Sequence, residues 1–123
     1  MFGNWLAINI YFNYIMAWLT SPGLSKDCQN LAIEYPVCKK CFYSKPPQTH
    51  HCIWCDSCVL KFDHHCPWIA NCVGHFNHRY FLLFMTYLVI SCFYFVSVGW
   101  KIFLISLDID TEVINDVFGG GDT

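Results

Sequence analysis

The chain has 123 residues, enough for one ordinary domain, of which 55% are hydrophobic and only 13% charged. Soluble domains carry about 25% charged residues, so the composition excludes an ordinary soluble domain and favours contact with a membrane. The formal net charge of −2 gives no reason to expect a nucleic-acid partner. Nine cysteines predict either disulfides or metal ligands and reactive thiols, depending on the compartment.

The chain begins with an apolar and aromatic stretch that has no charged residue from Met1 to Ser25. Residues 1–21 are predicted to form a transmembrane helix, at the short end of the roughly 20 residues that a span requires. A signal peptide is the alternative, but a basic n-region and a small-residue cleavage site are missing. Asn4, Asn9 and Asn13 are expected to face other helices. Ser21-Pro22-Gly23 ends the helix, and residues 22–37 are predicted to form a linker.

A second apolar stretch predicts a second transmembrane helix over residues 80–107, because no charge interrupts the segment from Tyr80 to Trp100. Residues 108–123 are acidic and predicted to be a disordered lumenal tail. Six of the seven basic residues lie between the two helices, and short basic loops stay in the cytosol. Residues 38–79 are therefore predicted to form a domain in the reducing cytosol, which favours zinc over disulfides.

Closely spaced cysteines and histidines follow one another in this predicted domain. Two cysteines separated by two residues can bind one tetrahedral zinc ion, and this spacing occurs at Cys38/Cys41, Cys52/Cys55 and Cys55/Cys58. One such pair is weak evidence, whereas three pairs beside histidines are strong evidence. The candidate ligands are Cys38, Cys41, His50, His51, Cys52, Cys55, Cys58, His64, His65, Cys66 and Cys72.

The number of candidates predicts two ions, because one zinc ion takes four ligands. Adjacent residues such as His51 and Cys52 seldom bind the same ion, which favours two interleaved Cys3His sites without forcing them. These sites would be Cys38, Cys41, His51 and Cys58, and Cys52, Cys55, His65 and Cys72. The alternatives are one ion held by Cys38, Cys41, Cys52 and Cys55, and a second site in which Cys66 replaces Cys72. His50 is predicted to be a surface or supporting residue.

Three reactive residue types, Asp63, His64 and Cys66, remain after this assignment. Cysteine reacts as the thiolate, a nearby histidine can take its proton, and a carboxylate can orient that histidine. In an extended chain His64 and Cys66 point to one side and His65 to the other, toward zinc. Pro67 favours an extended Cys66. The sequence thus predicts a thiol nucleophile beside a structural zinc ion, because a Cys3His site has no open position for substrate.

These residues resemble the DHHC family of protein S-acyltransferases (palmitoyltransferases). The matching elements are Cys38-x2-Cys41, Lys45-Pro46-Pro47, His51-Cys52, the two further CxxC steps, Asp63-His64-His65-Cys66-Pro67-Trp68, Cys72 and Asn77-His78-Arg79-Tyr80-Phe81. The flanking helices match the second and third membrane spans of that family. The expected fold is an α-helical integral membrane protein with a small, irregular, zinc-stapled cysteine-rich domain of short β-hairpins and loops between two transmembrane helices.

The resemblance implies two structural zinc ions in the interleaved arrangement. It also implies Cys66 as the acyl-accepting nucleophile, His64 as its base, Asp63 as the residue that orients the base and Trp68 in the wall of an acyl cavity. Cys66 would take a fatty acyl group from a fatty acyl-CoA such as palmitoyl-CoA and pass it to cysteines of membrane-associated proteins. Basic residues expected either to attract the CoA phosphates or to act only as topology signals are Lys39, Lys40, Lys45, Lys61 and Arg79. Membranes of the endoplasmic reticulum or Golgi are the expected location.

The chain departs from the family pattern in three ways. The family has four spans and this chain two, Ser21-Pro22-Gly23 stands where the family has Asp-Pro-Gly, and the Thr-Thr-x-Glu motif after the fourth span is missing. Two alternatives to an active acyltransferase follow. One is a membrane-tethered zinc module that binds partner proteins, and the other is a truncated form that binds zinc without forming an acyl-enzyme.

Overall fold

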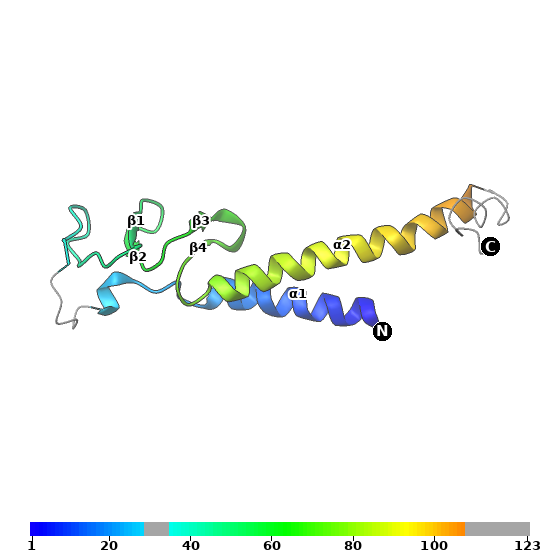
Figure 1. Ribbon diagram of the computed structural model, residues 1–123, viewed down its shortest axis with the longest axis horizontal. Helices are drawn as coiled ribbons and strands as arrows, with labels where there is room; N and C mark the ends of the chain where they lie inside the picture. The colour runs from blue at the N-terminus through cyan, green and yellow to red at the C-terminus, as the bar shows by residue number, and fades with distance from the viewer. Residues whose placement is uncertain (29–34, 108–123) are drawn as a thin grey trace, which may run out of the picture. The chain divides into compact units, whose positions relative to one another are not determined.

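The computed structural model describes residues 1–28 and 35–107, and the chain divides into two compact units, Met1–Leu88 and Val89–Thr123. In chain order the elements are α1 (Phe2–Leu19), η1 (Ser25–Cys28), β1 (His50–Cys52), β2 (Ser57–Val59), β3 (His64–Cys66), η2 (Pro67–Ile69), β4 (Asn71–Val73) and α2 (His78–Ser106) (Figure 1). All of them belong to the first unit except α2, which continues into the second unit from Val89 onward. The predicted tail, residues 108–123, lies outside the described residues.

Helix α1 has 18 residues and ends at Leu19, three residues before Pro22. Two of its three asparagines bond to the helix itself. The Asn9 amide donates to the carbonyl of Trp5 at 2.9 Å, and the Asn13 amide donates to the carbonyl of Asn9 at 2.8 Å. Each amide thus finds an acceptor one helical turn back, and Asn13 is also buried. The expectation that these asparagines face other helices stays a prediction.

Helix α2 begins at His78 and ends at Ser106, within two residues of the predicted bounds. Its 29 residues extend about 44 Å at 1.5 Å per residue, more than the roughly 30 Å hydrocarbon core of a bilayer. Within residues 1–28 and 35–107 it is the one helix both long and apolar enough to cross a membrane. Almost all of its apolar window is exposed, unlike the core helix of a soluble protein. A membrane span over residues 1–21 stays a prediction.

The predicted short hairpins are confirmed. Strands β1 and β2 pair antiparallel, as do β3 and β4, and every strand has three residues. Hairpins of this size are at best marginally stable in water. The buried cluster beneath them consists of Cys52, Val59 and Cys72, so two of its three members are cysteines that the sequence predicts to bind zinc. Apolar burial alone is too small to hold this region together.

The first residues of the predicted linker, residues 22–37, belong to the folded domain. The amide of Leu60 donates to the carbonyl of Gly23 at 2.9 Å, the amide of Phe76 donates to the carbonyl of Pro22 at 3.3 Å, and Leu24 forms an antiparallel bridge with Val59. The chain leaving α1 is thereby fixed between the end of β2 and the start of α2. Residues 29–34 of the predicted linker lie outside the described residues.

Gly74 lies where these segments cross, and we expect Gly74→Ala to destabilise the domain. An added Cβ would lie 2.7 Å from the carbonyl oxygen of Pro22 and 2.9 Å from that of Leu60, and backbone atoms cannot rotate away. Overpacking of this kind typically costs about 1–3 kcal/mol. The measurement is the midpoint temperature of zinc release in detergent. Gly99→Ala is the matched control, because the structure describes no atom within 4 Å of that Cβ position. Equal midpoint temperatures for the two variants would contradict the close approach of the Pro22 and Leu60 carbonyls to Gly74.

Helix α1 packs beside the first turns of α2 (Figure 1). The rings of Tyr14 and Phe84 lie 5.5 Å apart, and those of Trp5 and Tyr87 lie 5.6 Å apart. A small core forms where this helix pair meets the β3–β4 hairpin. Its buried members are Ala17, Cys66, Ile69 and Val73, with Tyr14, Tyr80 and Phe81 packed against them. The predicted nucleophile therefore lies at the junction of the helices and the hairpins.

Candidate functional site

Eight cysteine and histidine side chains gather into two clusters. The first contains Cys38, Cys41, His51 and Cys58, and the second contains Cys52, Cys55, His65 and Cys72. The candidate ligand atoms in each cluster all lie within 4.8 Å of one another. The strand register explains the arrangement, because His51 is paired with Cys58 across β1–β2 and His65 with Cys72 across β3–β4. The two groups have the membership that the interleaved arrangement predicts.

The geometry of both clusters fits tetrahedral zinc. Bonds of about 2.3 Å to sulfur and 2.0–2.1 Å to nitrogen place tetrahedral ligand atoms roughly 3.5–3.8 Å apart. The Sγ atoms of Cys41 and Cys58 are 3.4 Å apart. His65 Nδ1 lies 3.4 Å from the Sγ of Cys55 and 3.5 Å from that of Cys72. Each cluster supplies three thiols and one imidazole, which is a closed structural donor set.

The crowding and burial of the thiols shift their pKa values in both directions. Burial, followed by the neighbouring thiols, raises the pKa of Cys58 to about 12, and burial raises the pKa of Cys72 as well. Backbone hydrogen bonds from Cys41 and Lys40 lower the pKa of Cys38 to about 6. Thiols with a raised pKa lose their protons near neutral pH only when positive charge balances the thiolates. A divalent metal, which binds deprotonated cysteine, meets this requirement.

The clusters decide between the alternative ligand sets. Cys38 and Cys52 lie in different clusters, so a single ion held by the first two CxxC pairs is wrong. Cys72 belongs to the second cluster and Cys66 to neither. All eight cysteines whose side chains the structure describes are free thiols, which excludes disulfides among them. His50 is exposed, as predicted, with its ring 6.1 Å from that of Phe62.

Strand β3 places the predicted catalytic residues. His64, His65 and Cys66 form this strand, so the expected extended geometry is confirmed. Side chains alternate along a strand, and His65 joins the second zinc cluster. His64 and Cys66 share the opposite face, and both line one cavity. Cys66 is only 5% exposed, and the described part of the chain shows no direct hydrogen bond between it and His64.

Asp63 contacts two histidines with the same carboxylate oxygen. Its Oδ2 lies 3.2 Å from His64 Nδ1 and 3.9 Å from His78 Nε2. The ring of Phe81 packs edge-on against His64, with the ring centroids 5.1 Å apart. The carboxylate thus engages Nδ1 of His64, which leaves Nε2 as the nitrogen able to accept a proton. The sequence predicts such a contact between Asp63 and His64; their catalytic roles stay a prediction.

The cavity beside Cys66 is apolar. Its volume is about 650 Å³, within the roughly 300–1,000 Å³ of ligand pockets. The lining residues besides His64 and Cys66 are Tyr14 of α1, Pro67, Trp68 and Ile69 of η2, and Phe81, Phe84, Met85 and Leu88 of α2. Trp68 lies in this wall, where the sequence predicts it, and is 86% exposed. The Cys66 thiol therefore faces an apolar space large enough for a hydrocarbon chain.

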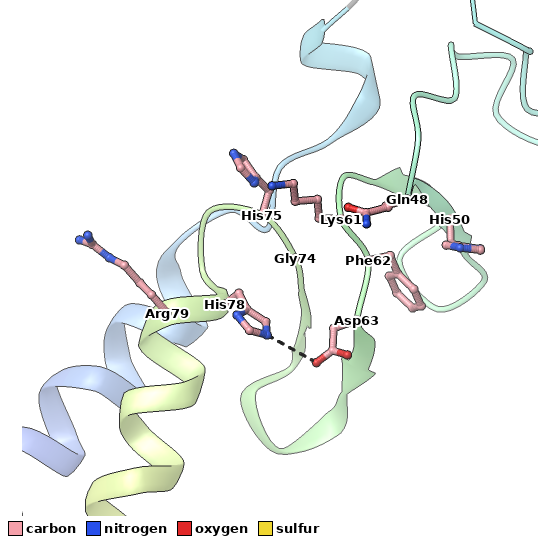
Figure 2. A pocket seen from close by; sticks show the side chains of 9 residues that line it. All are labelled: Gln48, His50, Lys61, Phe62, Asp63, Gly74, His75, His78 and Arg79. Atoms are coloured by element: carbon pink, nitrogen blue, oxygen red, sulfur yellow. Dashed lines mark ion pairs between the residues drawn. The ribbon is translucent and has the colours of Figure 1, made fainter.

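A second cavity, of about 640 Å³, has Asp63 in its wall, and most of the side chains that line it are polar or charged. Figure 2 shows the side chains of Gln48, His50 and Lys61 on one side and those of His78 and Arg79, at the start of α2, on the other. The dashed line marks the contact between Asp63 and His78. Of the basic residues predicted to meet CoA phosphates, this groove brings together Lys61 and Arg79 and does not include Lys39, Lys40 or Lys45.

Two asparagines fasten the end of α1 to the zinc domain. The Asn71 amide donates to the carbonyls of Trp18 at 3.0 Å and Thr20 at 3.1 Å. The fully buried Asn77 donates to the carbonyl of Ala17 at 3.2 Å and accepts a hydrogen bond from the amide of Gly74 at 2.9 Å. These side chains satisfy carbonyls that the last turn of a helix leaves unpaired.

Neither the contact of Asn71 with α1 nor the place of Tyr14 in the cavity wall is predicted from the sequence. The Tyr14 hydroxyl donates to the carbonyl of Trp68 at 3.0 Å. No local pattern around either residue indicates these long-range contacts. The apolar character of residues 1–21 indicates a helix but not which of its side chains meets the domain. Asn71 lies three residues after Trp68 in the sequence, and this proximity is the only local indication that it belongs to the site.

The comparisons with known proteins agree with this geometry. Residues 32–118 match a family described as DHHC palmitoyltransferase. The chain is 46% identical over 102 residues to palmitoyltransferase ZDHHC16 of Mus musculus and of Homo sapiens, and the match covers 83% of this chain. It is 52% identical over 66 residues, 54% of this chain and 12% of the relative, to palmitoyltransferase PFA3 of Gibberella zeae. The chain spans 28% of the mouse relative and 27% of the human one. With the family match covering most of its length, the chain belongs to the DHHC palmitoyltransferase family.

Proposed function

We propose that this chain carries the catalytic centre of a protein S-acyltransferase, with Cys66 as the nucleophile, His64 as its base and Asp63 as the residue that orients the base. The observation that carries the proposal is the position of Cys66. It is a free thiol outside both zinc clusters, on the same face of β3 as His64, in the wall of an apolar cavity. A purely structural zinc module has no use for this arrangement.

The proposed reaction has two transfers. His64 takes the thiol proton, and the Cys66 sulfur attacks the carbonyl carbon of a fatty acyl-CoA thioester. The bond from that carbon to the CoA sulfur breaks as the bond to Cys66 forms, and the CoA thiolate takes the proton. In the second transfer, the thiol of a cysteine in a membrane-associated protein attacks the acyl-enzyme in the same way. Each step exchanges one thioester for another, so no further reactant is required.

The two cavities suit the two parts of an acyl-CoA. Each methylene that leaves water for the apolar cavity contributes about 0.8 kcal/mol, so a long chain is favoured over a short one. The polar groove offers Lys61 and Arg79 to phosphates. Asp63 and His64 lie between the two spaces, because Asp63 lines the groove and His64 lines the cavity. The thioester would thus lie beside the base and the nucleophile.

The zinc ions have a structural role in this proposal. When bound, each supplies a closed tetrahedral centre that holds its hairpin, without an open position for substrate. His65 and Cys72, as ligands of the second ion, would fix the position of β3. We further propose that α1 and α2 both span the membrane, with the zinc domain in the cytosol, in the endoplasmic reticulum or the Golgi. The basic residues between the helices support this orientation.

The test is self-acylation. The full chain is purified in detergent with zinc and incubated with labelled palmitoyl-CoA, and we expect a hydroxylamine-sensitive label that Cys66→Ser abolishes. Cys92→Ser is the matched control, because Cys92 is an exposed cysteine of α2 outside both clusters, and it should leave the label unchanged.

Two results would contradict the proposal. One is a label of equal size in wild type and Cys66→Ser, which would place the reactive thiol elsewhere. The other is a chain that binds two zinc ions and takes no label. That second result would favour a zinc module or an inactive form.

A further inference from the structure

The zinc domain contains a sequence repeat with a shift of 14 residues. Residues 50–62, HHCIWCDSCVLKF, align with residues 64–76, HHCPWIANCVGHF, and seven of the 13 aligned residues are identical: two His, Cys, Trp, Cys, Val and Phe. The same shift relates the two metal clusters, because Cys38, Cys41, His51 and Cys58 become Cys52, Cys55, His65 and Cys72. The interleaving of the clusters is therefore the overlap of successive repeats.

The backbone repeats with the sequence. We call the segments 38–42 and 52–56, each of which begins with a CxxC pair, the two zinc knuckles. In both, the residue after the second cysteine has a left-handed conformation, with φ +59° at Phe42 and +46° at Asp56. One further shift of 14 residues leads to Ala70, which also has φ +46°. Few residues other than glycine adopt this conformation, so three of them in register indicate a shared turn. Residues 66–70 are thus a third copy of the knuckle.

The third copy begins with Cys66 and lacks its second cysteine. Ile69 stands at the position of Cys41 and Cys55. Ile69 is 1% exposed and packs with Cys66 and with Ala17 of α1. The two other ligand positions of a third site would fall at Arg79 and Thr86 of α2, and neither side chain is a zinc ligand. The third copy is therefore held by apolar packing against α1, whereas the first two copies contribute their cysteines to the metal clusters.

We propose that Cys66 stands at the first ligand position of an incomplete third zinc knuckle, and that Ile69, in the place of the second thiolate, keeps this thiol free of metal. Two thiolates from one knuckle chelate zinc together, whereas a single thiol competes poorly with the two complete clusters. Ile69 is in this sense a positioning residue for the proposed acyl transfer. The proposal rests on the proposed acyl transfer, because that reaction is what requires a metal-free Cys66. The zinc binding that it predicts can be measured without any activity.

The test is the variant Ile69→Cys, studied as the full chain in detergent with a reductant and a small excess of zinc. We expect a third equivalent of zinc per chain. Cobalt substitution should add a third set of thiolate-to-metal absorption bands. Self-acylation should fall at least about tenfold and return when a mild chelator removes the third ion. The added zinc should change the wild-type rate less than about twofold.

Two controls make the result specific. Ile69→Ser removes the same packing without adding a ligand. It should bind two zinc ions, and its labelling rate, whatever its level, should be the same with and without the excess zinc. The double variant Ile69→Cys/Cys66→Ala adds the new thiol without its partner and should also bind two.

Each contrary outcome has a separate meaning. A zinc count of two with an unchanged label in Ile69→Cys overturns the proposal. A count below two in both Ile69→Cys and Ile69→Ser overturns it too, because Ile69 would then serve packing alone. If wild type takes no label at all, the proposed function fails, and the zinc count by itself decides whether the third knuckle exists.

Discussion

Replacing His64 by alanine should slow self-acylation of Cys66 by about 10²–10⁴-fold at pH 7, the usual contribution of a general base. His64 shares a strand face and a cavity wall with Cys66, and Asp63 holds its Nδ1 at 3.2 Å. Asp63→Asn should slow the reaction in the same direction and by less, because the imidazole remains while its orientation and the stabilisation of its charged form are weakened. The measurement is the rate of hydroxylamine-sensitive labelling.

Raising the pH provides an internal control for this variant. A free cysteine ionises by itself near pH 8.5, so the need for a base declines as the pH rises. The ratio of wild-type to His64→Ala rates should therefore shrink between pH 6.5 and pH 9. Both proteins should keep two zinc ions, because His64 belongs to neither cluster. Equal rates at pH 7, with the label still on Cys66, would remove His64 from the mechanism.

Removing zinc should unfold the hairpins and abolish acylation together. Structural zinc contributes about 10–16 kcal/mol in zinc-finger peptides at pH 7, more than the whole stability of many small domains. The buried cluster under the hairpins is small, and the thiols of Cys52 and Cys72 form most of it. A strong chelator should abolish the circular dichroism of the domain and the label with one midpoint. If the circular dichroism and the label were lost at different chelator concentrations, folding of the hairpins and activity would not depend on zinc in the same way.

Single ligand substitutions should separate the two ions. Cys72→Ala breaks the cluster that contains His65, the residue between His64 and Cys66, and should leave one zinc and no label. Cys58→Ala breaks the other cluster and should leave one zinc and a reduced label, because β3 and β4 keep their own ion. Cys92→Ala should keep both ions. A wild-type label in Cys72→Ala would show that the second ion does not position the nucleophile.

Much of the site could be predicted from local sequence. The CxxC spacing and the avoidance of adjacent ligands favour the two clusters. The alternation of side chains along an extended chain separates Cys66 from His65, and the structure shows this strand. The uncharged run from Tyr80 to Trp100 indicates α2. These features depend on residues near one another in sequence, where spacing and periodicity carry direct geometric information.

The rest depends on contacts between distant residues. Tyr14 reaches Trp68, and Asn71 reaches Trp18, across more than 50 residues. No single-sequence pattern specifies such pairs. The asparagines of α1 show the same limit, because a polar residue in an apolar helix can bond to another helix or to its own backbone, and Asn9 and Asn13 bond to their own. The polar groove combines residues from three separate stretches of the chain, 48–50, 61–63 and 74–79.

The hydrogen bonds from Asn71 to α1 bear on which cysteines an acyltransferase of this form selects. Asn71 is paired with Cys66 across β3–β4 and bonds to the carbonyls at the end of α1. If α1 lies in the bilayer, as proposed, this contact would hold the Cys66 sulfur at a fixed depth beside the lipid headgroups. An extended chain covers about 3.3–3.6 Å per residue, so a target cysteine a few residues from its own membrane anchor reaches this depth. A cysteine on a distant folded surface does not. Selection of this kind would depend on the distance of a cysteine from the bilayer and not on its sequence, so it would accept many unrelated sequences around the modified residue.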